Sequence, residues 1–332
     1  MDRRQTIIDI LETLRKSEFA HNNKWKVRAY TNVINQLKQM TEPVTKMDDL
    51  KDIKGIGEKI KLKIEEILTT GDLPKAHEIG KEVDVINNLT RVFGIGPVRA
   101  KELYTTHGVE KVEDLEHKRE LLTDKQIIGL KYYKDFELRI KRSEMDKHAD
   151  IIKTTIQNLY PDLLVEVMGS YRRGIADSGD IDVLITHRDD PDNYSIYFDG
   201  IIKHLSDGGY ITDVFAQGKK KFNGVCRLKR HKYHRRLDIM YTRKKEWAFA
   251  LLYFTGDQNF NILFRKLALD NHLSMNEYGF KHTRGEHKMS LDKVFEDERA
   301  VFEYLGVEYI PPEDRNGRVV FRPLVKSNLP SS

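Results

Sequence analysis

Cysteine is almost absent from this chain, and no long apolar run occurs in it. The single cysteine is Cys226, so neither an internal disulfide nor a thiolate zinc cluster can form. No apolar run approaches the length of a membrane span, and the start Met1-Asp2-Arg3-Arg4 lacks the apolar stretch of a secretory signal. We therefore expect no membrane association and an intracellular, reducing environment.

Acidic residues are missing from one segment. Between Asp213 and Asp238 there is no aspartate or glutamate, whereas basic side chains accumulate. These are Lys219, Lys220, Lys221, Arg227, Lys229, Arg230, Lys232, Arg235 and Arg236. A stripe of one sign favours a polyanionic substrate, although a solvated basic loop or a nuclear-import signal gives the same pattern.

The composition is that of a globular protein. With 332 residues, 33% of them charged and 39% hydrophobic, the chain can fill two or three compact units. Its net charge of +5 is modest, so the distribution of charge is more informative than the total.

Two aspartates separated by a single residue are the strongest indication of a catalytic site. Asp180 and Asp182 lead into the apolar run that continues to Ile185, and Asp238 lies in a second apolar run. Side chains alternate in a strand, so Asp180 and Asp182 point the same way. Such carboxylates suit magnesium, and Asp238 completes a clamp on two ions.

The segment before these aspartates offers groups that bind phosphate. An isolated pair of this kind is more often a solvated strand end. Here Gly169-Ser170-Tyr171-Arg172-Arg173-Gly174 follows the apolar run 163–168 and provides backbone N–H groups, a hydroxyl and two guanidinium groups. The combination predicts a triphosphate site.

An internal near-repeat lies in the first half of the chain. The segments 52–60 and 91–99 share Gly-Ile-Gly, with Gly55 and Gly57 in the first and Gly94 and Gly96 in the second, and each opens an amphipathic helix. Both are typical of helix-hairpin-helix elements, in which glycines allow a tight turn and free N–H groups bind a DNA phosphate. Plain helix-capping turns are the alternative.

Hydrophobic periodicity divides the chain into two classes of structure. Residues 1–80 have helical spacing and no strand signal. From about residue 143, β-branched runs at 163–167, 181–185 and 237–241 alternate with helical stretches at 145–159 and 260–269, and short strand-like pieces follow up to about 312. We predict a helical N-terminal part followed by an α+β part.

The ordered motifs resemble those of the family X DNA polymerases, most closely the polymerase beta branch, with some features of the lambda branch. G-S-x-R-R-G, G-D-x-D-V-L and R-R-x-D-I all occur, and the resemblance runs from about residue 1 to Arg315. Segments 129–132, 222–226, 252–256 and 276–278 share it.

The resemblance implies a division into five parts. These are a helical lyase-like domain at 1–80, a DNA-binding subdomain at 81–142, a catalytic palm at 143–243, a subdomain at 244–315 that binds the nascent base pair, and a flexible tail at 316–332.

The resemblance also implies roles for individual residues. Asp180, Asp182 and Asp238 hold two Mg²⁺ ions, for which Mn²⁺ can substitute. Nucleotide-binding positions are Arg142, Gly169, Ser170, Arg173, Gly179, Tyr253, Phe254, Gly256 and Asn261. DNA-binding positions, besides the four hairpin glycines, are Lys24, Lys51, Lys59, Lys221, Arg236, Arg265 and Tyr278. Carbonyls of Ile53 and Ile56, and of Thr90, Val92 and Ile95, hold Na⁺ or K⁺.

A second activity follows from the lysines of the first hairpin. Lys59 and Lys63 lie four residues apart, on one face of the expected helix. Positive neighbours favour a neutral amine that can form a Schiff base with an abasic sugar. The resemblance identifies Lys63 as the nucleophile of a 5′-deoxyribose phosphate lyase; a surface lysine stripe is the alternative.

Three positions depart from the family pattern. Asp257 stands where a serine is usual, which puts triphosphate affinity in question. Met240 replaces an arginine that controls the third aspartate in polymerase beta, and Val27 falls near the place of a tyrosine in the phosphate pocket.

We therefore expect a template-directed repair polymerase that fills short gaps in base excision repair and has lyase activity. The alternatives are a terminal or RNA-tailing nucleotidyltransferase and a non-catalytic gap-binding scaffold. The expected partners of this monomer are gapped or nicked DNA, deoxynucleoside triphosphates, a DNA ligase and other repair factors. The expected location is the nucleus in a eukaryotic cell, or a viral factory or virion if the source is a virus.

Overall fold

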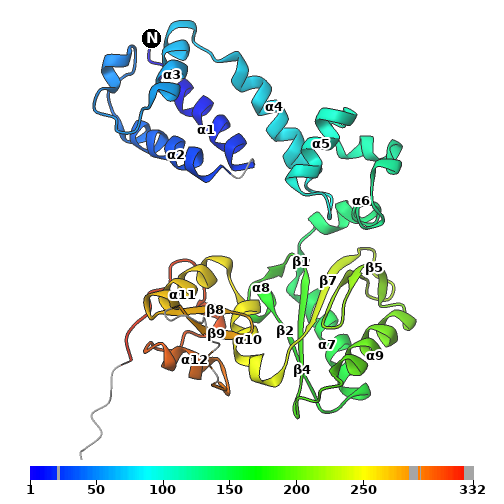
Figure 1. Cartoon of the computed structure of the whole chain (residues 1–332). Coiled ribbons are helices and arrows are strands. Elements are labelled where there is room, and N and C mark those ends of the chain that lie inside the picture. The colour runs from blue at the N-terminus through cyan, green and yellow to red at the C-terminus, as the bar shows by residue number, and fades with distance from the viewer. Residues whose placement is uncertain (21–22, 284–290, 292, 325–332) are drawn as a thin grey trace, which may run out of the picture. The chain divides into compact units, whose positions relative to one another are not determined.

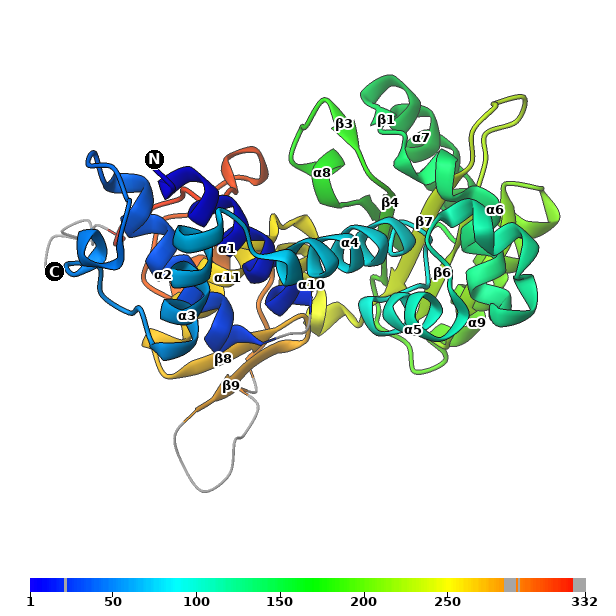
Figure 2. The same ribbon diagram turned by 90° about the horizontal axis from the view of Figure 1, so that it is seen from above.

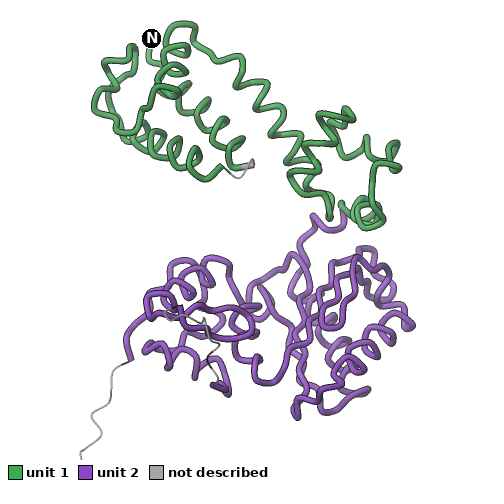
Figure 3. Tube along the Cα trace, viewed as in Figure 1, with its two compact units in different colours: residues 1–133 green, residues 134–332 purple. Residues whose placement is uncertain are grey.

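The computed structural model describes residues 1–20, 23–283, 291 and 293–324. Its contacts divide the chain into two compact units, Met1–Tyr133 and Lys134–Ser332 (Figure 3). Within the described residues, no helix combines the length and the apolar character needed to cross a membrane. The finer division with boundaries at 80, 142, 243 and 315 stays a prediction.

The first unit begins with a helical bundle built on one apolar stripe per helix. It contains α1 (Arg4–Ala20), α2 (Lys24–Gln39), the short η1 (Met47–Leu50), α3 (Glu58–Thr70) and α4 (Pro74–Leu89). In α2, Tyr30, Val33, Ile34 and Leu37 recur at helical spacing and pack into a core with residues of α1 and α3. Burial of this stripe holds the bundle together.

A second helical cluster completes the unit. Figure 2 shows α4 leading from the first bundle to α5 (Pro97–His107), followed by η2 (Val112–His117), η3 (Arg119–Leu121) and α6 (Asp124–Glu137). A Cβ at Gly129 would lie 2.1 Å from the carbonyl oxygen of Phe93, so α6 packs directly on the backbone of the second hairpin. Among the described residues of this unit there is no strand, which confirms the helical N-terminal prediction.

The second unit is centred on a mixed five-stranded sheet. Its order is β2 (Leu163–Val167), β4 (Ile181–His187), β7 (Arg235–Tyr241), β6 (Lys221–Cys226) and β5 (Ile211–Gln217), and β4 pairs with β7 in parallel while the other pairs are antiparallel. The helices α7 (Arg142–Leu159) and α9 (Tyr194–Asp207) pack on one face (Figure 1).

Strand alternation separates the core of this sheet from its polar face. Ile181, Val183 and Ile185 contribute to the core that α7 and α9 share, so Asp182 projects from the opposite face. β1 (Ile140–Lys141) pairs with β3 (Asp177–Ser178) in a short second sheet. The one-turn helix α8 (Gly169–Arg172) and β3 directly precede β4 in sequence.

The C-terminal part of this unit is mainly helical. It contains η4 (Lys244–Glu246), α10 (Trp247–Thr255), α11 (Gln258–Asp270), the hairpin of β8 (Leu273–Asn276) and β9 (Gly279–His282), α12 (Glu298–Tyr304) and η5 (Pro312–Asp314). An aromatic cluster that includes Phe249, Phe260, Phe264 and Phe302 forms its core. From the sequence we expected only strand-like pieces after residue 270. That expectation missed α12, which Asp297 caps.

The first part of the predicted flexible tail is folded. Phe321 packs against Phe260 and Phe264, with ring centroids 6.1 and 5.6 Å apart, and the amide of Leu324 donates to the carbonyl of Gly306 at 2.9 Å. Residues 316–324 therefore belong to the folded unit, because their apolar side chains complete the aromatic core. Residues 325–332 of the predicted tail lie outside the described residues.

A buried charge cluster joins α8 to α12. Glu298 accepts hydrogen bonds from Arg172 at 2.6 and 3.0 Å and from Arg315 at 2.5 Å, and Arg315 is fully buried. Burial works against the charge of Arg172, but the Glu298 carboxylate outweighs it and raises the pKa of Arg172 above its ordinary value. The Glu298 carboxylate is thus the shared counter-ion of two guanidinium groups.

Replacement of Glu298 should destabilise the second unit. Glu298→Gln leaves the fully buried Arg315 and the partly buried Arg172 without their counter-ion, and we expect a loss of about 3 kcal/mol in the free energy of unfolding. The chain has two tryptophans, and a Trp25→Phe background leaves Trp247, in α10, as a fluorescent reporter of this unit during urea unfolding. Asp207→Asn, which breaks the exposed pair with Lys203, is the matched control and should cost less than about 1 kcal/mol. Equal losses for the two variants would contradict this account.

Candidate active site

Three carboxylates meet on the polar face of the sheet. Asp180 precedes β4, Asp182 lies within it, and Asp238 lies opposite Asp182 in the parallel register of β4 with β7. One oxygen of each lies within 4.8 Å of the others. Among the described residues, this is the only group of three metal-ligating side chains so close together. The structure thus brings together the three aspartates that the sequence singled out.

The charges of this cluster are only partly balanced by the protein. Burial, together with the negative charges of Asp180 and Asp238, raises the pKa of Asp182 to about 7. Arg236 forms an ion pair with Asp180, and Nδ2 of Asn223 donates to Oδ1 of Asp238 at 2.7 Å. Oxygen donors that repel one another fit a divalent cation, which relieves the repulsion.

The turn before β4 approaches the cluster closely. Gly169 has φ +60°, and a Cβ there would lie 2.8 Å from Oδ2 of Asp182, so this position needs glycine for both reasons. The Ser170 hydroxyl donates to the Ser178 hydroxyl at 2.8 Å. Arg173 donates to the carbonyl of Thr255. Burial lowers the pKa of Arg173, and the negative charges of Asp257 and Asp182, which act to raise it, offset only part of this effect.

Two arginines flank the phosphate-binding segment in different ways. Arg142, the predicted nucleotide ligand, donates to the carbonyl of Tyr171 at 2.7 Å and stacks 3.9 Å from its ring centroid. Arg139 pairs with Asp177 at 2.7 Å, and its Nη1 would lie 3.0 Å from a Cβ at Gly179. Arg139 was not among the residues predicted from the sequence, although it lies only three residues before Arg142.

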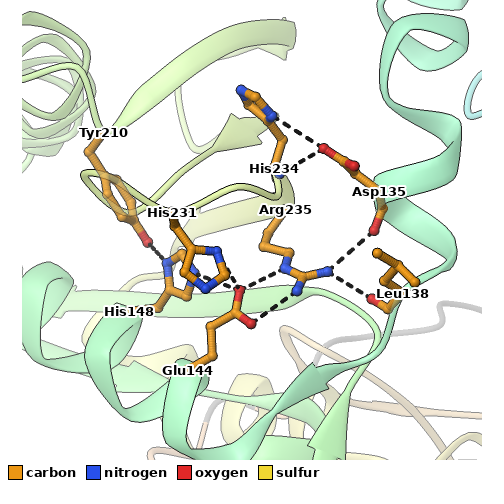
Figure 4. A network of polar contacts seen from close by, with 8 residues as sticks. All are labelled: Asp135, Leu138, Glu144, His148, Tyr210, His231, His234 and Arg235. Atoms are coloured by element: carbon orange, nitrogen blue, oxygen red, sulfur yellow. Dashed lines mark hydrogen bonds and ion pairs between the residues drawn. The ribbon is translucent and has the colours of Figure 1, made fainter.

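The β7 strand is held in place by a buried polar network (Figure 4). Arg235 donates to both carboxylate oxygens of Glu144, at 2.7 and 3.0 Å, and to the carbonyl of Leu138 at 2.9 Å. Burial raises the pKa of Glu144, but the hydrogen bonds and charge of Arg235 outweigh it, and the net pKa is lowered. Burial lowers the pKa of His148 to about 4, and its Nδ1 lies 2.6 Å from the Tyr210 hydroxyl. This network anchors the strand three residues before Asp238.

The predicted base-pair residues gather between α10 and α11. The Asn261 side chain donates to the carbonyl of Tyr253 at 2.8 Å, and the Arg265 guanidinium lies 5.1 Å from the Tyr253 ring centroid. The rings of Tyr253 and Phe254 meet edge to face at 4.9 Å. Gly256, with φ +65°, separates the two helices.

Two departures from the family pattern now have structural explanations. Asp257 caps α11, because its carboxylate accepts from the amide of Phe260 at 2.8 Å. Met240 is buried in an apolar cluster with Met168, Leu184 and Trp247. Its side chain therefore supports packing on the sheet rather than an ion pair with the aspartates.

The remaining predicted DNA contacts of the second unit are accessible. Lys221 is exposed in β6, where it is the register partner of Met240. Tyr278 lies in the turn between β8 and β9 and is 47% exposed. Both positions remain available for a ligand.

The first unit presents the two hairpins as matched turns. Gly55 and Gly94 have φ of +94° and +92°, and Gly57 and Gly96 are the N-caps of α3 and α5. Side-chain amides hold each loop: Asn32 and Gln36 donate to the carbonyl of Lys54 at 2.9 and 2.8 Å, and Gln126 donates to the carbonyl of Gly94 at 3.0 Å. The flanking N–H groups can thus meet a phosphate at a fixed helix start.

The carbonyl positions predicted for a monovalent ion lie in these same loops. Ile53 and Ile56 flank the first turn, and Thr90, Val92 and Ile95 surround the second. The carbonyl of Val92 also accepts from the amide of Ile95 at 3.0 Å. A carbonyl oxygen has two lone pairs, so this bond leaves one for another ligand.

Lys63 contacts a tyrosine that the sequence analysis did not select. Its Nζ donates to the Tyr30 hydroxyl at 3.1 Å and lies 5.7 Å from that ring centroid. Tyr30 lies in α2, one turn after Val27, and is otherwise buried. Lys24, Lys51 and Lys59 are exposed.

Comparison with known proteins covers nearly the whole chain. Four family models match in order along it: a helix-hairpin-helix domain at 2–73, the fingers domain of DNA polymerase lambda at 87–137, the DNA polymerase beta palm at 139–244 and the DNA polymerase beta thumb at 250–316.

Three relatives align over most of this chain. DNA polymerase lambda of Rattus norvegicus is 33% identical over 323 residues, 93% of this chain and 56% of that protein. DNA polymerase lambda of Arabidopsis thaliana is 27% identical, over 87% of this chain and 57% of that protein. A DNA nucleotidylexotransferase of Gallus gallus is 25% identical over 84% of this chain and 61% of that protein.

The chain therefore spans little more than half the length of these curated relatives. A position nearer to polymerase beta than to polymerase lambda stays a prediction. With four family models in the expected order and three carboxylates in one cluster, the chain belongs to the family X DNA polymerases.

Proposed function

We propose that this chain is a template-directed DNA repair polymerase that fills short gaps, and that its first unit has 5′-deoxyribose phosphate lyase activity. The carboxylate cluster of Asp180, Asp182 and Asp238 carries the proposal. Base excision repair needs both activities, because the gap must be filled and the abasic sugar phosphate removed. The proposed ligands are gapped or nicked DNA and deoxynucleoside triphosphates; a DNA ligase and other repair factors are proposed partners of the monomer.

The three carboxylates fit two magnesium ions, with manganese as a substitute. Asp180 and Asp182 would hold both ions and Asp238 one of them. Bound there, the ions would polarise the α-phosphate and offset the charge that develops on the attacking and leaving oxygens. The all-oxygen donor set and the raised pKa of Asp182 support this, because a nearby cation favours its ionised form.

The protein groups act by position and charge. The primer 3′-hydroxyl oxygen bonds to the α-phosphorus, the bond from that phosphorus to the bridging oxygen breaks, and pyrophosphate leaves. Asp238 helps to accept the hydroxyl proton. Groups that offset the charge of the leaving pyrophosphate are Ser170, Arg173, the Gly179 backbone, Arg142 and Arg139.

The template-directed reading is supported by the contacts of α11. Asn261 and Arg265 both contact Tyr253, beside Phe254. We propose that these two side chains reach the nascent base pair. Relatives that work without a template carry Gly-Trp there. A terminal transferase remains the alternative, and the two differ in whether extension requires a template.

The two hairpins are proposed to hold DNA through phosphates alone. Each would use N–H groups at the start of α3 or α5, with Na⁺ or K⁺ bridging the loop carbonyls to a phosphate. Lys24, Lys51 and Lys59 would bind the 5′-phosphate of the gap. Recognition of this kind is independent of base sequence and sensitive to salt.

The lyase step is assigned to Lys63. Its neutral amine adds to the aldehyde carbon of the abasic sugar, and loss of water gives a Schiff base. Removal of a C2′ proton then breaks the C3′–O bond and releases the DNA strand. The hydrogen bond to the Tyr30 hydroxyl orients the amine.

Primer extension should require the third carboxylate. Asp238→Asn removes an anionic ligand and proton acceptor, and we expect the extension rate to fall at least about 1,000-fold, as for other groups that act on the transition state. Gapped-DNA affinity should stay within about threefold, because phosphate contacts dominate it. Glu166→Gln, a half-exposed carboxylate in β2, is the control and should retain activity. Substantial synthesis by a folded Asp238→Asn protein would exclude the two-metal assignment.

Gap filling should prefer a 5′-phosphate. A one-nucleotide gap with the phosphate should be filled several-fold more efficiently than the same gap without it, because Lys24 and Lys59 bind that phosphate. The double variant Lys24→Ala/Lys59→Ala should lose the preference and reduce the slope of log K against log salt by about 2. Equal efficiency on recessed primers and on both kinds of gap would count against this prediction.

Borohydride should trap the protein on pre-incised abasic DNA, even with a chelator present. Lys63→Ala should lose nearly all trapping but keep primer extension, whereas Asp182→Ala should do the reverse. Lys61→Ala, on the same helix and paired with Glu65, is the matched control and should trap normally. Undiminished trapping by Lys63→Ala would mean that another amine is the nucleophile or that the lyase assignment is wrong.

A further inference from the structure

Three polar side chains lie in one row across the sheet. Asp182 of β4 is the register partner of Asp238 of β7, and Asp238 is the register partner of Asn223 of β6. Directly paired residues project from the same face of a sheet. Asn223 therefore borders Asp238 on the side away from Asp182, and both line a cavity of about 170 Å³ with Phe254.

The hydrogen bond between Asn223 and Asp238 is short, and only Asn223 can be its donor. Nδ2 of Asn223 lies 2.7 Å from Oδ1 of Asp238. An ionised carboxylate only accepts hydrogen bonds, so the amide must present its NH₂ group. A bond of this length to an anion is charge-assisted and stronger than a neutral one.

A neutral donor differs from a cation in its effect on a metal site. Asp180 is paired with Arg236, whose positive charge competes with a bound cation. Asn223 instead holds one oxygen of Asp238 and adds no net charge.

We propose that Asn223 is a positioning residue for Asp238: its amide fixes Oδ1 and so aims Oδ2 at the centre of the carboxylate cluster. The inference rests on the proposed polymerase function and assigns to Asn223 a part in the same reaction. Asn223 touches no reacting atom; it acts through the orientation of Asp238.

The test compares two substitutions in the full chain. Asn223→Leu keeps the branched shape and removes the donor, and Asn223→Asp keeps both shape and polarity but can only accept when ionised. Gln217→Leu is the matched control, since its amide donates to the Asp199 carboxylate at 3.2 Å, between β5 and α9. Each variant is measured by Mn²⁺ titration without DNA, by single-turnover extension at saturating nucleotide, and by gapped-DNA binding.

Loss of the donor should slow chemistry and leave substrate binding unchanged. Asn223→Leu should weaken Mn²⁺ binding about fivefold and slow single-turnover extension about tenfold, the effect of one charge-assisted hydrogen bond. Nucleotide and gapped-DNA dissociation constants should stay within about twofold, and excess metal should restore part of the rate. Asn223→Asp should slow extension at least as much, because it faces Asp238 with a like charge. Gln217→Leu should match the parent in all three measurements.

Two outcomes overturn the proposal. One is that either Asn223 variant, correctly folded by circular dichroism, keeps both the extension rate and the Mn²⁺ affinity of the parent. The other is that the loss lies in nucleotide or DNA affinity instead of the rate. If Asn223→Leu does not fold, the extension rate and Mn²⁺ affinity of Asn223→Asp decide whether the proposal holds. A parent protein without extension activity would refute the proposed function itself, and the Mn²⁺ titration would then decide on Asn223 alone.

Discussion

The parallel pairing of β4 with β7 is the constraint on which the active site depends. Asp182 and Asp238 are 56 residues apart in sequence, and only this register places them opposite each other on one face. A slip of one residue would turn one of them into the core, where Ile181, Val183 and Ile239 now pack. The core and the site are thus set by the same pairing, and apolar burial on one face fixes carboxylate geometry on the other.

Each of the three neighbouring carboxylates has a different electrostatic environment. Arg236 neutralises Asp180, the Asn223 amide holds Asp238, and Asp182 keeps a raised pKa between them. A divalent cation bound among these carboxylates would relieve the repulsion between them. Next to the cluster, the buried pair of Arg235 with Glu144 anchors the start of β7.

In the first unit, long-range contacts hold two loops in shape. Its two hairpins need backbone at positive φ, which Gly55 and Gly94 supply, and side-chain amides from neighbouring helices hold the loop carbonyls. The phosphate recognition proposed for these loops needs no base contact. The lysine proposed for the lyase reaction lies on the helix that the first hairpin opens, so the proposed DNA anchoring and the proposed amine chemistry share one short segment, α3.

Sequence alone determined the fold class, the helical first part, the main strands and the three aspartates, because alternation and helical spacing are local properties. It also identified the hairpins, since Gly-Ile-Gly before a helix is a local signal. Only the tertiary structure decided which arginine lies beside Gly179, that Asp257 caps α11, and that residues 316–324 close the aromatic core. The contacts of Asn223 with Asp238 and of Tyr30 with Lys63 join residues 15 and 33 positions apart. No periodicity in sequence encodes such pairs, because register and helix packing bring them together.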